Sequence, residues 1–309
     1  MQWRYRRQKG ISTISTTLQS QDHPRRQIGL IGFGLMGTAI AGRLIEHGFQ
    51  VSVWNRSRDK VLPHISQNLV WSDNPFAECQ RVVVSLYSSD IVKEVLNDMK
   101  GAIRPGQWII DTTTGAPEDS QRLGMSFEAQ GVFYLDAPIS GSSEQTRRGE
   151  ATVMVGGDEG AFDANADLWP VLGRRVFFVA GFGSAAKMKL VSNLVLGLNR
   201  AALAEGLAFA ETIGVSPAAA LEVLKESAAY SKVMDVKGNK MISRDFTAAA
   251  KLSQHLKDVR LINDAAHRNN LELPLSSAHQ QVLSQAEADG LGELDNCSII
   301  QVYRKGLHE

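Results

Sequence analysis

Three glycines within six residues interrupt an apolar run near the start of the chain, and their spacing constrains the fold more than any other feature. The stretch IGLIGFGLMGTAIAGRL, residues 28–44, holds Gly32, Gly34 and Gly37 in the pattern G-x-G-x-x-G. An apolar strand pattern precedes the glycines, a helical pattern follows them, and a second strand pattern, QVSVW, comes one helix length later. Glycines weaken strands and helices, so their presence here indicates that a ligand approaches the backbone closely. This order of elements is typical of a dinucleotide-binding βαβ unit.

Each glycine has a distinct task in such a unit. Gly32 permits the tight turn, Gly34 lets a pyrophosphate lie against the backbone, and Gly37 lets the helix pack closely on the strand. The amides and the positive dipole of the helix N-terminus then bind the phosphates. The alternative is a tight turn in an α/β fold that binds no nucleotide. We predict that the cofactor contacts Gly32, Phe33, Gly34, Leu35, Met36 and Gly37.

The end of the second strand selects between NAD and NADP. An acidic residue there would accept hydrogen bonds from the adenosine ribose and repel a 2′-phosphate. This chain instead has Asn55, Arg56 and Ser57, in the sequence WNRSRDK. The Arg56 guanidinium suits a phosphate, whereas a solvated surface arginine is the alternative. We therefore predict cofactor contacts from these three residues and binding of NADP(H) in preference to NAD(H).

Strand and helix patterns alternate from Gln27 to about Gly181, and then the strand patterns stop. β-Branched runs such as RVVVSL and WIID separate helical stretches such as SDIVKEVLNDM. This alternation predicts a largely parallel, doubly wound α/β sheet, with ATVMVGG as a candidate antiparallel strand. After Gly183, about thirty mostly apolar helix-forming residues begin a region of helices. We predict a Rossmann-type NADP-binding domain at 27–183 and an all-helical substrate and oligomerisation domain at 184–309, joined by this long helix.

The first 26 residues differ from the rest of the chain. They hold six basic residues and a single acid, with the Ser/Thr cluster STISTT between them. Such a composition is typical of an organelle transit peptide, while a disordered extension and a start codon assigned too far upstream explain it equally well. We predict a cytoplasmic protein, or an imported one if this leader is a targeting peptide.

The overall composition favours a small-molecule partner. Lys plus Arg and Asp plus Glu number 33 each, which gives no reason to expect nucleic acid or an acidic membrane as the partner. The two cysteines, Cys79 and Cys297, are far apart, and the histidines are scattered, so we predict neither a disulfide nor a metal site. No apolar run reaches the length of a membrane span.

Two further stretches, together with the glycine pattern, resemble the β-hydroxyacid dehydrogenase family. DAPISGSSEQTRRGEATVMVGG, residues 136–157, is similar to the family's substrate segment. GFGSAAKMKLVSNLVLG, residues 181–197, is similar to its glycine-led helix with a catalytic Lys and Asn. The resemblance runs from about residue 27 to the C-terminus. It implies an NAD(P)-dependent oxidoreductase like 3-hydroxyisobutyrate dehydrogenase, tartronate semialdehyde reductase and the glyoxylate/succinic semialdehyde reductases.

Lys189 and Asn193 are the predicted catalytic pair. They are four residues apart, which places them one turn apart on the same face of a helix otherwise rich in Leu, Val and Ala. Burying a lysine and an amide is unfavourable unless both are used, and partial desolvation helps an ammonium to give up a proton. The resemblance implies that Lys189 donates a proton to the substrate carbonyl and that Asn193 orients Lys189 or the substrate. Lys187 is the alternative donor, although Val191 four residues later cannot be its amide partner.

The resemblance assigns roles to residues at other strand ends. Ser140 and Gly141 would anchor a substrate carboxylate, with a plain turn as the alternative. Thr114 would lie beside the nicotinamide and the substrate. Leu86 and Tyr87 would border the cofactor between its phosphates and its ribose.

The sequence LKDVRL contains one more pair that matches the family. By the resemblance, Lys257 reaches the cofactor and Asp258 reaches the substrate. A surface salt bridge between them is an equally good reading.

Some positions depart from the family's pattern. Thr146 stands where the family usually keeps a small Ala, and Arg147 and Arg148 follow it. Ala250 stands near the place where the glyoxylate reductases carry a Phe. A bulkier or more anionic substrate would fit these changes.

These observations favour an NADPH-dependent reductase of short semialdehydes or 2-oxo acids, of the glyoxylate/succinic semialdehyde type. A 3-hydroxyisobutyrate or other 3-hydroxyacid dehydrogenase is the second candidate. Imine reductases share the fold but generally replace the catalytic lysine, which this chain retains. A non-enzymatic NADP-binding assembly or sensor protein is the third reading. The apolar long helix predicts a homodimer or homotetramer.

Overall fold

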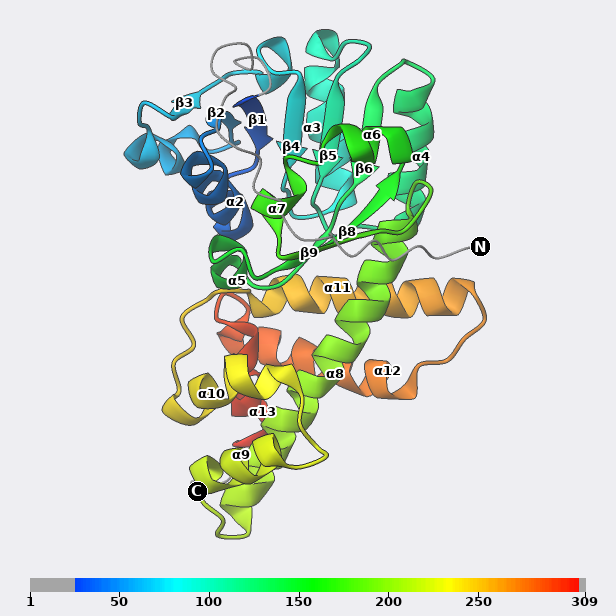
Figure 1. Cartoon of the computed structure of the whole chain (residues 1–309). Helices are drawn as coiled ribbons and strands as arrows, with labels where there is room; N and C mark the ends of the chain where they lie inside the picture. Colours follow the sequence, from blue (N-terminus) through cyan, green and yellow to red (C-terminus); the bar gives the residue numbers. More distant parts are fainter. Residues whose placement is uncertain (1–25, 306–309) are drawn as a thin grey trace. The chain divides into compact units, whose positions relative to one another are not determined.

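The computed structural model describes residues 26–305 (Figure 1). The leader at 1–26 therefore lies outside the described residues except for Arg26, as do residues 306–309. The chain forms two compact units, of which the first ends at Lys189 and the second begins at Leu190. This division falls inside a helix, slightly beyond residue 183, and the domain limits given above stay a prediction.

The strands of the first unit form one sheet in the order β3-β2-β1-β4-β5-β6-β8-β7, with β9 paired to β8. Neighbouring strands from β3 to β6 run parallel, and β8 is antiparallel to β6. The predicted doubly wound sheet and its antiparallel strand are thus confirmed. The strands are β1 (Gln27–Ile31), β2 (Gln50–Trp54), β3 (Leu69–Trp71), β4 (Arg81–Val84), β5 (Trp108–Asp111), β6 (Phe133–Asp136), β7 (Ile139–Ser140), β8 (Thr152–Gly157) and β9 (Arg175–Phe178).

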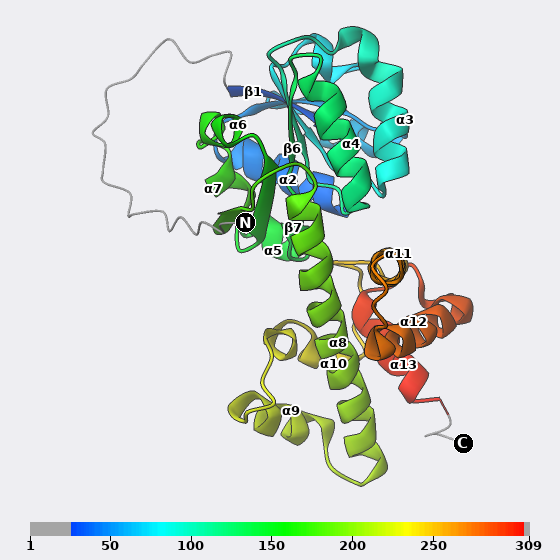
Figure 2. The ribbon, with the colours of Figure 1, turned by 90° about the vertical axis from the view of Figure 1, so that its right-hand side faces the viewer.

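Helices cover both faces of this sheet, which explains why its central strands are apolar throughout. Ile40 and Leu44 of α2 pack on one face, and Val92 and Leu96 of α3 pack on the other. Figure 2 shows α3 and α4 on one side of the sheet and α2, α6 and α7 on the opposite side. The helices are α2 (Leu35–Glu46), α3 (Ser89–Met99), α4 (Pro117–Glu128), α5 (Ser143–Arg147), α6 (Glu159–Ala164) and α7 (Trp169–Leu172), with short 3-10 turns η1 (Arg58–Lys60), η2 (Leu62–His64), η3 (Pro75–Ala77) and η4 (Lys100–Ala102).

The strand order makes the glycine turn a natural place for a ligand. The sheet grows from β1 toward β2 on one side and toward β4 on the other. Ligands of open α/β sheets bind beyond the carboxyl ends of the strands at such a reversal. The turn that contains Gly32 follows β1 directly, so the predicted nucleotide loop lies at this switch point.

The second unit consists of helices, and no strand is assigned within residues 190–305. The predicted long helix is α8 (Ser184–Thr212), which begins in the first unit and continues into the second. Figure 2 shows α9 and α10 on one side of α8 and α11 to α13 on the other. The remaining helices are α9 (Pro217–Glu226), α10 (Asn239–Ser243), α11 (Leu252–Arg268), α12 (Pro274–Ala286) and α13 (Ile300–Tyr303), the π-helical turns η5 (Met234–Gly238) and η6 (Glu287–Leu291) and the 3-10 turn η7 (Asn296–Ile299).

Helical periodicity explains the core of the second unit. Leu252, Leu256, Val259 and Ile262 recur every three or four residues along α11, and all four are buried. Leu252, Leu256 and Val259 pack in one cluster with buried leucines of α8 such as Leu207. Within residues 26–305, no helix has both the length and the apolar character that a bilayer-spanning segment needs.

Candidate active site

The three glycines of the predicted nucleotide loop differ in what surrounds them. Gly32 has a φ of +100°, and a Cβ built on it would lie 2.2 Å from the carbonyl oxygen of Ser85. A Cβ on Gly37 would lie 2.0 Å from the carbonyl oxygen of Gly32. A Cβ on Gly34 would meet no atom within 4 Å. The fold itself therefore requires Gly32 and Gly37, whereas the open space at Gly34 fits the approach of a ligand such as a diphosphate.

The start of α2 is suited to an anion. Gly34 is the N-cap residue, so no cap side chain accepts from the first amides, and the first turn contains no acidic residue. Helix N-termini of this kind present N–H donors and a positive dipole to phosphates. The residues expected to contact the cofactor there, Gly32 to Gly37, thus form a turn whose chemistry fits a dinucleotide.

Asn55 has a structural task that the sequence did not reveal. Its Oδ1 accepts a hydrogen bond from the N–H of Phe33 at 3.0 Å, and its Nδ2 donates to the carbonyl oxygen of Ser57 at 2.8 Å. Asn55 therefore holds the glycine turn against the end of β2. Arg56 and Ser57 are exposed just beyond it, where a ribose phosphate could reach them.

A stacked pair near Arg56 also escaped the sequence analysis. The Arg58 guanidinium lies over the ring of Trp71 at 5.1 Å, and Trp71 Nε1 donates to Asp73 Oδ1 at 2.8 Å. The pair joins η1 to the end of β3. Because the partners lie on separate elements, no local pattern could have indicated their contact.

The predicted residues at the ends of β4 and β5 lie on the same edge of the sheet as the glycine turn. The N–H of Leu86 donates to Thr113 Oγ1 at 3.1 Å, which ties the two strand ends together. Tyr87 is exposed, and Leu86 and Thr114 are half-buried. The structure thus brings these residues to the edge where a cofactor bound by the glycine turn would extend.

Two buried carboxyl groups lie next to each other at this edge, and the sequence analysis assigned neither. Asp111 and Asp136 are register partners at the ends of β5 and β6. Asp111 accepts hydrogen bonds from the Thr113 N–H at 2.9 Å and from the Tyr134 hydroxyl at 2.8 Å. Burial raises the pKa of Asp111, although these hydrogen bonds oppose the rise.

Asp136 binds the start of α8. Its Oδ1 accepts from the N–H of Gly183 at 3.1 Å, and its Oδ2 accepts from the N–H of Ala186 at 2.9 Å. Burial raises the pKa of Asp136 to about 7; the two N–H groups lower it, and the charge of Asp111 raises it further. This carboxyl group therefore titrates near neutral pH while it caps the helix that carries Lys189.

The two candidate lysines of α8 differ in exposure. Lys189 is buried, with only 6% of its surface exposed, and Lys187 is exposed. Lysines are almost never fully buried unless their charge is paired, and Lys237, which is equally buried, pairs with Asp295. The assignment of Lys189 as the catalytic residue therefore stays a prediction. Ser140 and Gly141, expected to bind the substrate, follow the DAP segment: Ser140 ends the short strand β7, and Gly141 has a φ of +156°.

Asn193 and the LKD pair come together within the second unit. Asn193 Nδ2 donates to Asp258 Oδ2 at 2.9 Å, and Lys257 Nζ lies 2.9 Å from Asp258 Oδ1. Asn193 and Asp258 are both buried. The Lys257–Asp258 ion pair that the sequence analysis gave as the alternative is thus formed, although Asp258 is buried, and the binding roles of the two residues stay a prediction. The hydrogen bond to Asp258 uses the amide nitrogen of Asn193, so the amide oxygen is the part of the side chain that can accept a hydrogen bond.

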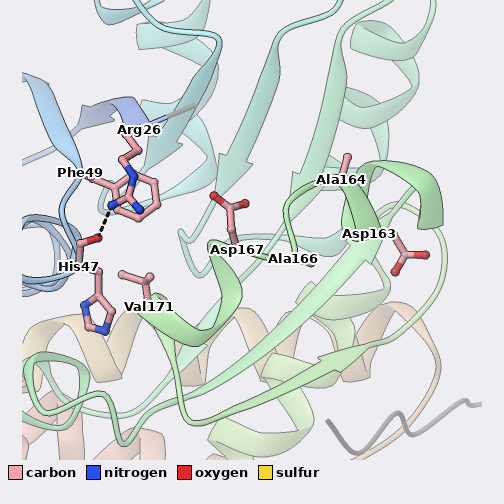
Figure 3. Close-up of a pocket in the computed structure, with 8 residues that line it drawn as sticks. All are labelled: Arg26, His47, Phe49, Asp163, Ala164, Ala166, Asp167 and Val171. Atoms are coloured by element: carbon pink, nitrogen blue, oxygen red, sulfur yellow. Dashed lines mark hydrogen bonds between the residues drawn. The ribbon is translucent and has the colours of Figure 1, made fainter. Parts of the chain in front are cut away.

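One cavity of the first unit lies elsewhere. It has a volume of about 420 Å³ and lies near the amino ends of β1 and β2, as Figure 3 shows. Its lining comprises Arg26, His47, Phe49, Asp163, Ala164, Ala166, Asp167 and Val171. Inside it, Arg26 donates to the carbonyl oxygen of His47 at 3.3 Å. None of the predicted site residues lines this cavity, so it is distinct from the edge described above.

Comparison with known proteins agrees with this geometry. Residues 27–181 match the model of the NAD binding domain of 6-phosphogluconate dehydrogenase, and residues 183–303 match the NAD-binding model of NADP-dependent 3-hydroxyisobutyrate dehydrogenase. The chain belongs to the β-hydroxyacid dehydrogenase family. As a member of this family, the protein is an NAD(P)-dependent oxidoreductase that acts on CH–OH groups.

Three individual relatives illustrate the similarity. Glyoxylate/succinic semialdehyde reductase 1 of Arabidopsis thaliana is 28% identical over 90% of this chain and 98% of its own length. The protein of the same plant named "Probable 3-hydroxyisobutyrate dehydrogenase-like 1, mitochondrial" is 30% identical over 96% of this chain and 90% of its own length. The solved structure of Psf3 in complex with NADP+ and 2-OPP is 26% identical, with a TM-score of 0.82, and covers 89% of this chain and 99% of that one.

Proposed function

We propose that this β-hydroxyacid dehydrogenase is an NADPH-dependent reductase of short semialdehydes or 2-oxo acids, with Lys189 as proton donor. The observation that carries the proposal is the burial of Lys189 beside an exposed Lys187 on the same helix. Similarity to glyoxylate/succinic semialdehyde reductases supports the substrate class. The second candidate, a 3-hydroxyisobutyrate or other 3-hydroxyacid dehydrogenase, is supported by a relative of that name.

The bound nicotinamide supplies the hydride, and the protein's own residues do the rest. Lys189 Nζ donates a proton to the carbonyl oxygen as the carbonyl carbon is reduced, so an aldehyde or ketone becomes an alcohol. Asn193, one turn further along α8, offers its carbonyl oxygen to the Lys189 ammonium or to the substrate hydroxyl. Asp258 fixes that amide in the required orientation through its hydrogen bond to Nδ2. Preorganised groups of this kind lower the barrier without reorganising during the reaction.

The substrate carboxylate binds to Ser140 and the N–H of Gly141, at the strand end where family members hold it. Thr114 follows the end of β5 and contacts the nicotinamide and the substrate. Thr146 near this segment is fully buried, so its extra atoms, relative to alanine, occupy space inside the fold rather than in the solvent. A panel of short semialdehydes, 2-oxo acids and 3-hydroxy acids, followed by NADPH absorbance, tests this substrate class.

Replacement of each lysine by methionine tests the assignment of the proton donor. We expect Lys189→Met to lower kcat by at least about a thousandfold, since it removes the proton donor, and Lys187→Met to change it less than about threefold. A large loss in Lys187→Met with normal turnover in Lys189→Met would show that the other lysine faces the substrate.

Preference for NADPH rests on the exposed Arg56 beyond β2, with the Arg58–Trp71 pair beside it. Arg56 binds the 2′-phosphate, because a guanidinium forms charge-assisted hydrogen bonds with phosphate oxygens. We expect Arg56→Ala to weaken NADPH binding by about tenfold and to leave NADH binding unchanged. Tighter binding of NADH than of NADPH by the unmodified protein would exclude the preference.

Self-association is the proposed state of the protein. Phe209 is 62% exposed near the end of α8, and Ile213 and Val223 are also exposed in the same unit. Exposed large apolar side chains favour burial against another copy of the chain. Sedimentation that gave a stable monomer at micromolar concentration would refute a homodimer or homotetramer.

Although membership of this family makes the protein an oxidoreductase, the sequence analysis also gave a non-enzymatic NADP-binding reading. The burial of Lys189 and of the Asn193–Asp258 pair weighs against it, since an assembly or sensor role does not need either. Turnover of any substrate in the panel above decides between the two.

The cytoplasm is the proposed compartment, and fusion of residues 1–26 to a fluorescent reporter would reveal organelle import.

A further inference from the structure

The first turn of α8 cannot cap itself. Helices commonly satisfy their first amides with a capping box, in which an N-cap Ser or Thr and an N3 Glu or Gln each accept one N–H. In α8 these two positions are Gly183 and Ala186, neither of which has a side chain that can accept a hydrogen bond. Gly183 also resists replacement, because its φ is +76° and a Cβ on it would lie 2.5 Å from the carbonyl oxygen of Pro117.

Asp136 supplies both missing acceptors from a strand. One carboxylate oxygen accepts from the N–H of Gly183 and the other from the N–H of Ala186, at 3.1 and 2.9 Å. These are the two N–H groups that a capping box would satisfy. The carboxylate is 2% exposed and ends β6, so it anchors the helix start to the sheet that carries the nucleotide loop.

Two further glycines make room for this attachment. Gly156 of β8 lies opposite Asp136 in the ladder, and a Cβ there would come within 2.6 Å of Asp136 Oδ1 and 2.8 Å of the Gly181 carbonyl oxygen. A Cβ on Gly124 of α4 would come within 2.3 Å of the Phe182 ring. The first turn of α8 therefore fits against the sheet and α4 with no spare space.

We infer that Asp136 is a positioning residue for the reaction: it fixes the first turn of α8, and thereby the place of Lys189 relative to the bound nicotinamide. This inference rests on the proposed role of Lys189. Lys189 is three residues beyond Ala186, which is a rise of about 4.5 Å along the helix. A shift or tilt of the first turn is transmitted to the Lys189 ammonium almost in full, and misplacement by about 1 Å can cost about a hundredfold in rate.

Asp136→Asn tests the inference with little change in volume. The amide keeps one acceptor oxygen but turns an NH₂ group toward a backbone N–H, which breaks one of the two hydrogen bonds. We expect kcat to fall about 10- to 100-fold, with the NADPH dissociation constant within about twofold of the unmodified protein. We also expect a larger solvent deuterium isotope effect on kcat, because a displaced donor makes proton transfer slower.

The control removes a carboxylate cap from a helix that carries no site residue. Asp158 accepts from the N–H of Ala161 at 2.7 Å and caps α6 in the same unit. Asp158→Ala therefore also costs the first unit a helix cap. It should leave kcat, KM and the isotope effect unchanged. The comparison therefore separates the effect of lower stability from the effect of a displaced Lys189.

Gly156→Ala provides a second, independent variant. It leaves every polar group in place but presses on Asp136 and the backbone before α8. We expect the same pattern: a lower kcat, a larger isotope effect and unchanged NADPH affinity. This variant decides the matter if Asp136→Asn does not fold.

The outcomes separate the inference from the proposed function. Failure of the unmodified protein to reduce any substrate in the panel refutes the function itself. An active unmodified protein, with folded Asp136→Asn and Gly156→Ala variants whose kcat lies within about twofold of it, overturns the positioning role of Asp136. A kcat loss in Asp158→Ala as large as in Asp136→Asn overturns it as well.

Discussion

The tripeptide Gly-Phe-Gly occurs twice in this chain, at residues 32–34 and 181–183, and each copy leads directly into a helix. The first copy opens α2, whose first turn contains no acidic residue and whose cap glycine has open space around it. The second copy opens α8, whose first amides donate to the carboxylate of Asp136. The same three residues thus begin one helix whose N-terminus is suited to the anion of a ligand. They also begin another helix whose N-terminus already binds the carboxylate of Asp136.

The contrast shows what makes a glycine-led helix start an anion site. Both starts provide N–H donors and a helix dipole, which favour negative charge. At α8 the charge comes from a residue 47 positions before Gly183, at the end of β6. At α2 no carboxylate among residues 26–305 caps the turn, so we expect the charge to come from a ligand. The glycine pattern alone cannot distinguish these cases, but the presence or absence of a nearby carboxylate can.

We expect the largest effect, on NADPH affinity, when the start of α2 is given a carboxylate like the one that binds the start of α8. Gly34 has a φ of −81° and no neighbour within 4 Å of an added Cβ, so aspartate fits there. In Gly34→Asp the new carboxylate would accept from the α2 amides and repel the diphosphate. We expect the NADPH dissociation constant to rise by at least about a hundredfold, since two charge-assisted hydrogen bonds of about 1.5 kcal/mol each are lost. Fluorescence titration with NADPH measures this change.

Gly34→Ala is the matched control for that variant, because it adds the same Cβ without the charge. We expect a smaller loss of affinity than in Gly34→Asp, and no loss of thermal stability in either, since aspartate is a favourable N-cap residue. Equal NADPH dissociation constants in the two variants would show that sterics alone, and not charge, explain the affinity.

The second effect concerns the free energy of unfolding. We expect this free energy to fall when Gly183 is replaced but not when Gly34 is replaced. Gly183 has a positive φ and lies close to Pro117, whereas Gly34 has neither restraint. We expect Gly183→Ala to lower the free energy of unfolding by about 1–3 kcal/mol, while Gly34→Ala changes it by less than about 0.5 kcal/mol. Urea unfolding of both variants measures the difference. Similar losses in the two would mean that the fold, rather than a ligand, requires glycine at position 34.

The sequence predicted the first of these two turns because everything that defines it is local. The strand, the three glycines and the helix follow one another within residues 28–44, and the doubly wound sheet follows from the same alternation. Helical periodicity likewise separated Lys189 from Lys187, because two residues along a helix point in different directions. The helical second unit was predictable for the same reason.

What the sequence could not predict depends on contacts between distant residues. Asp136 lies in the DAP segment, yet nothing in that segment indicates that its carboxylate caps α8. Asn55 was expected to bind the cofactor, and its bond to the Phe33 N–H depends on how the β2 end meets the glycine turn. The contact of Arg58 with Trp71 joins two separate elements. Such pairings are decided by tertiary packing, which no spacing along the chain encodes.

The last effect is a pH dependence of the free energy of unfolding, which only the start of α8 should have. Burial raises the folded-state pKa of Asp136 to about 7, well above the ordinary value of about 4. Between these values the folded protein holds a proton that the unfolded chain has released, so the free energy of unfolding falls as pH rises from about 4 to 7 and is level above. The slope is at most about 1.4 kcal/mol per pH unit.

Asp136→Asn should abolish this slope, which is measured as the difference in unfolding free energy between the unmodified protein and the variant from pH 4.5 to 8. The difference is needed because other groups titrate in the same window. The pKa of His279 is lowered to about 4 by burial and by the charge of Arg200, so His279 makes stability rise with pH in both proteins and cancels. A difference that does not vary with pH would show that Asp136 stays ionised throughout. The Asp136 carboxylate at the start of α8 would then stay negatively charged over this pH range, as a bound phosphate would at the start of α2. The two helix starts would differ only in whether the charge belongs to the protein or to a ligand.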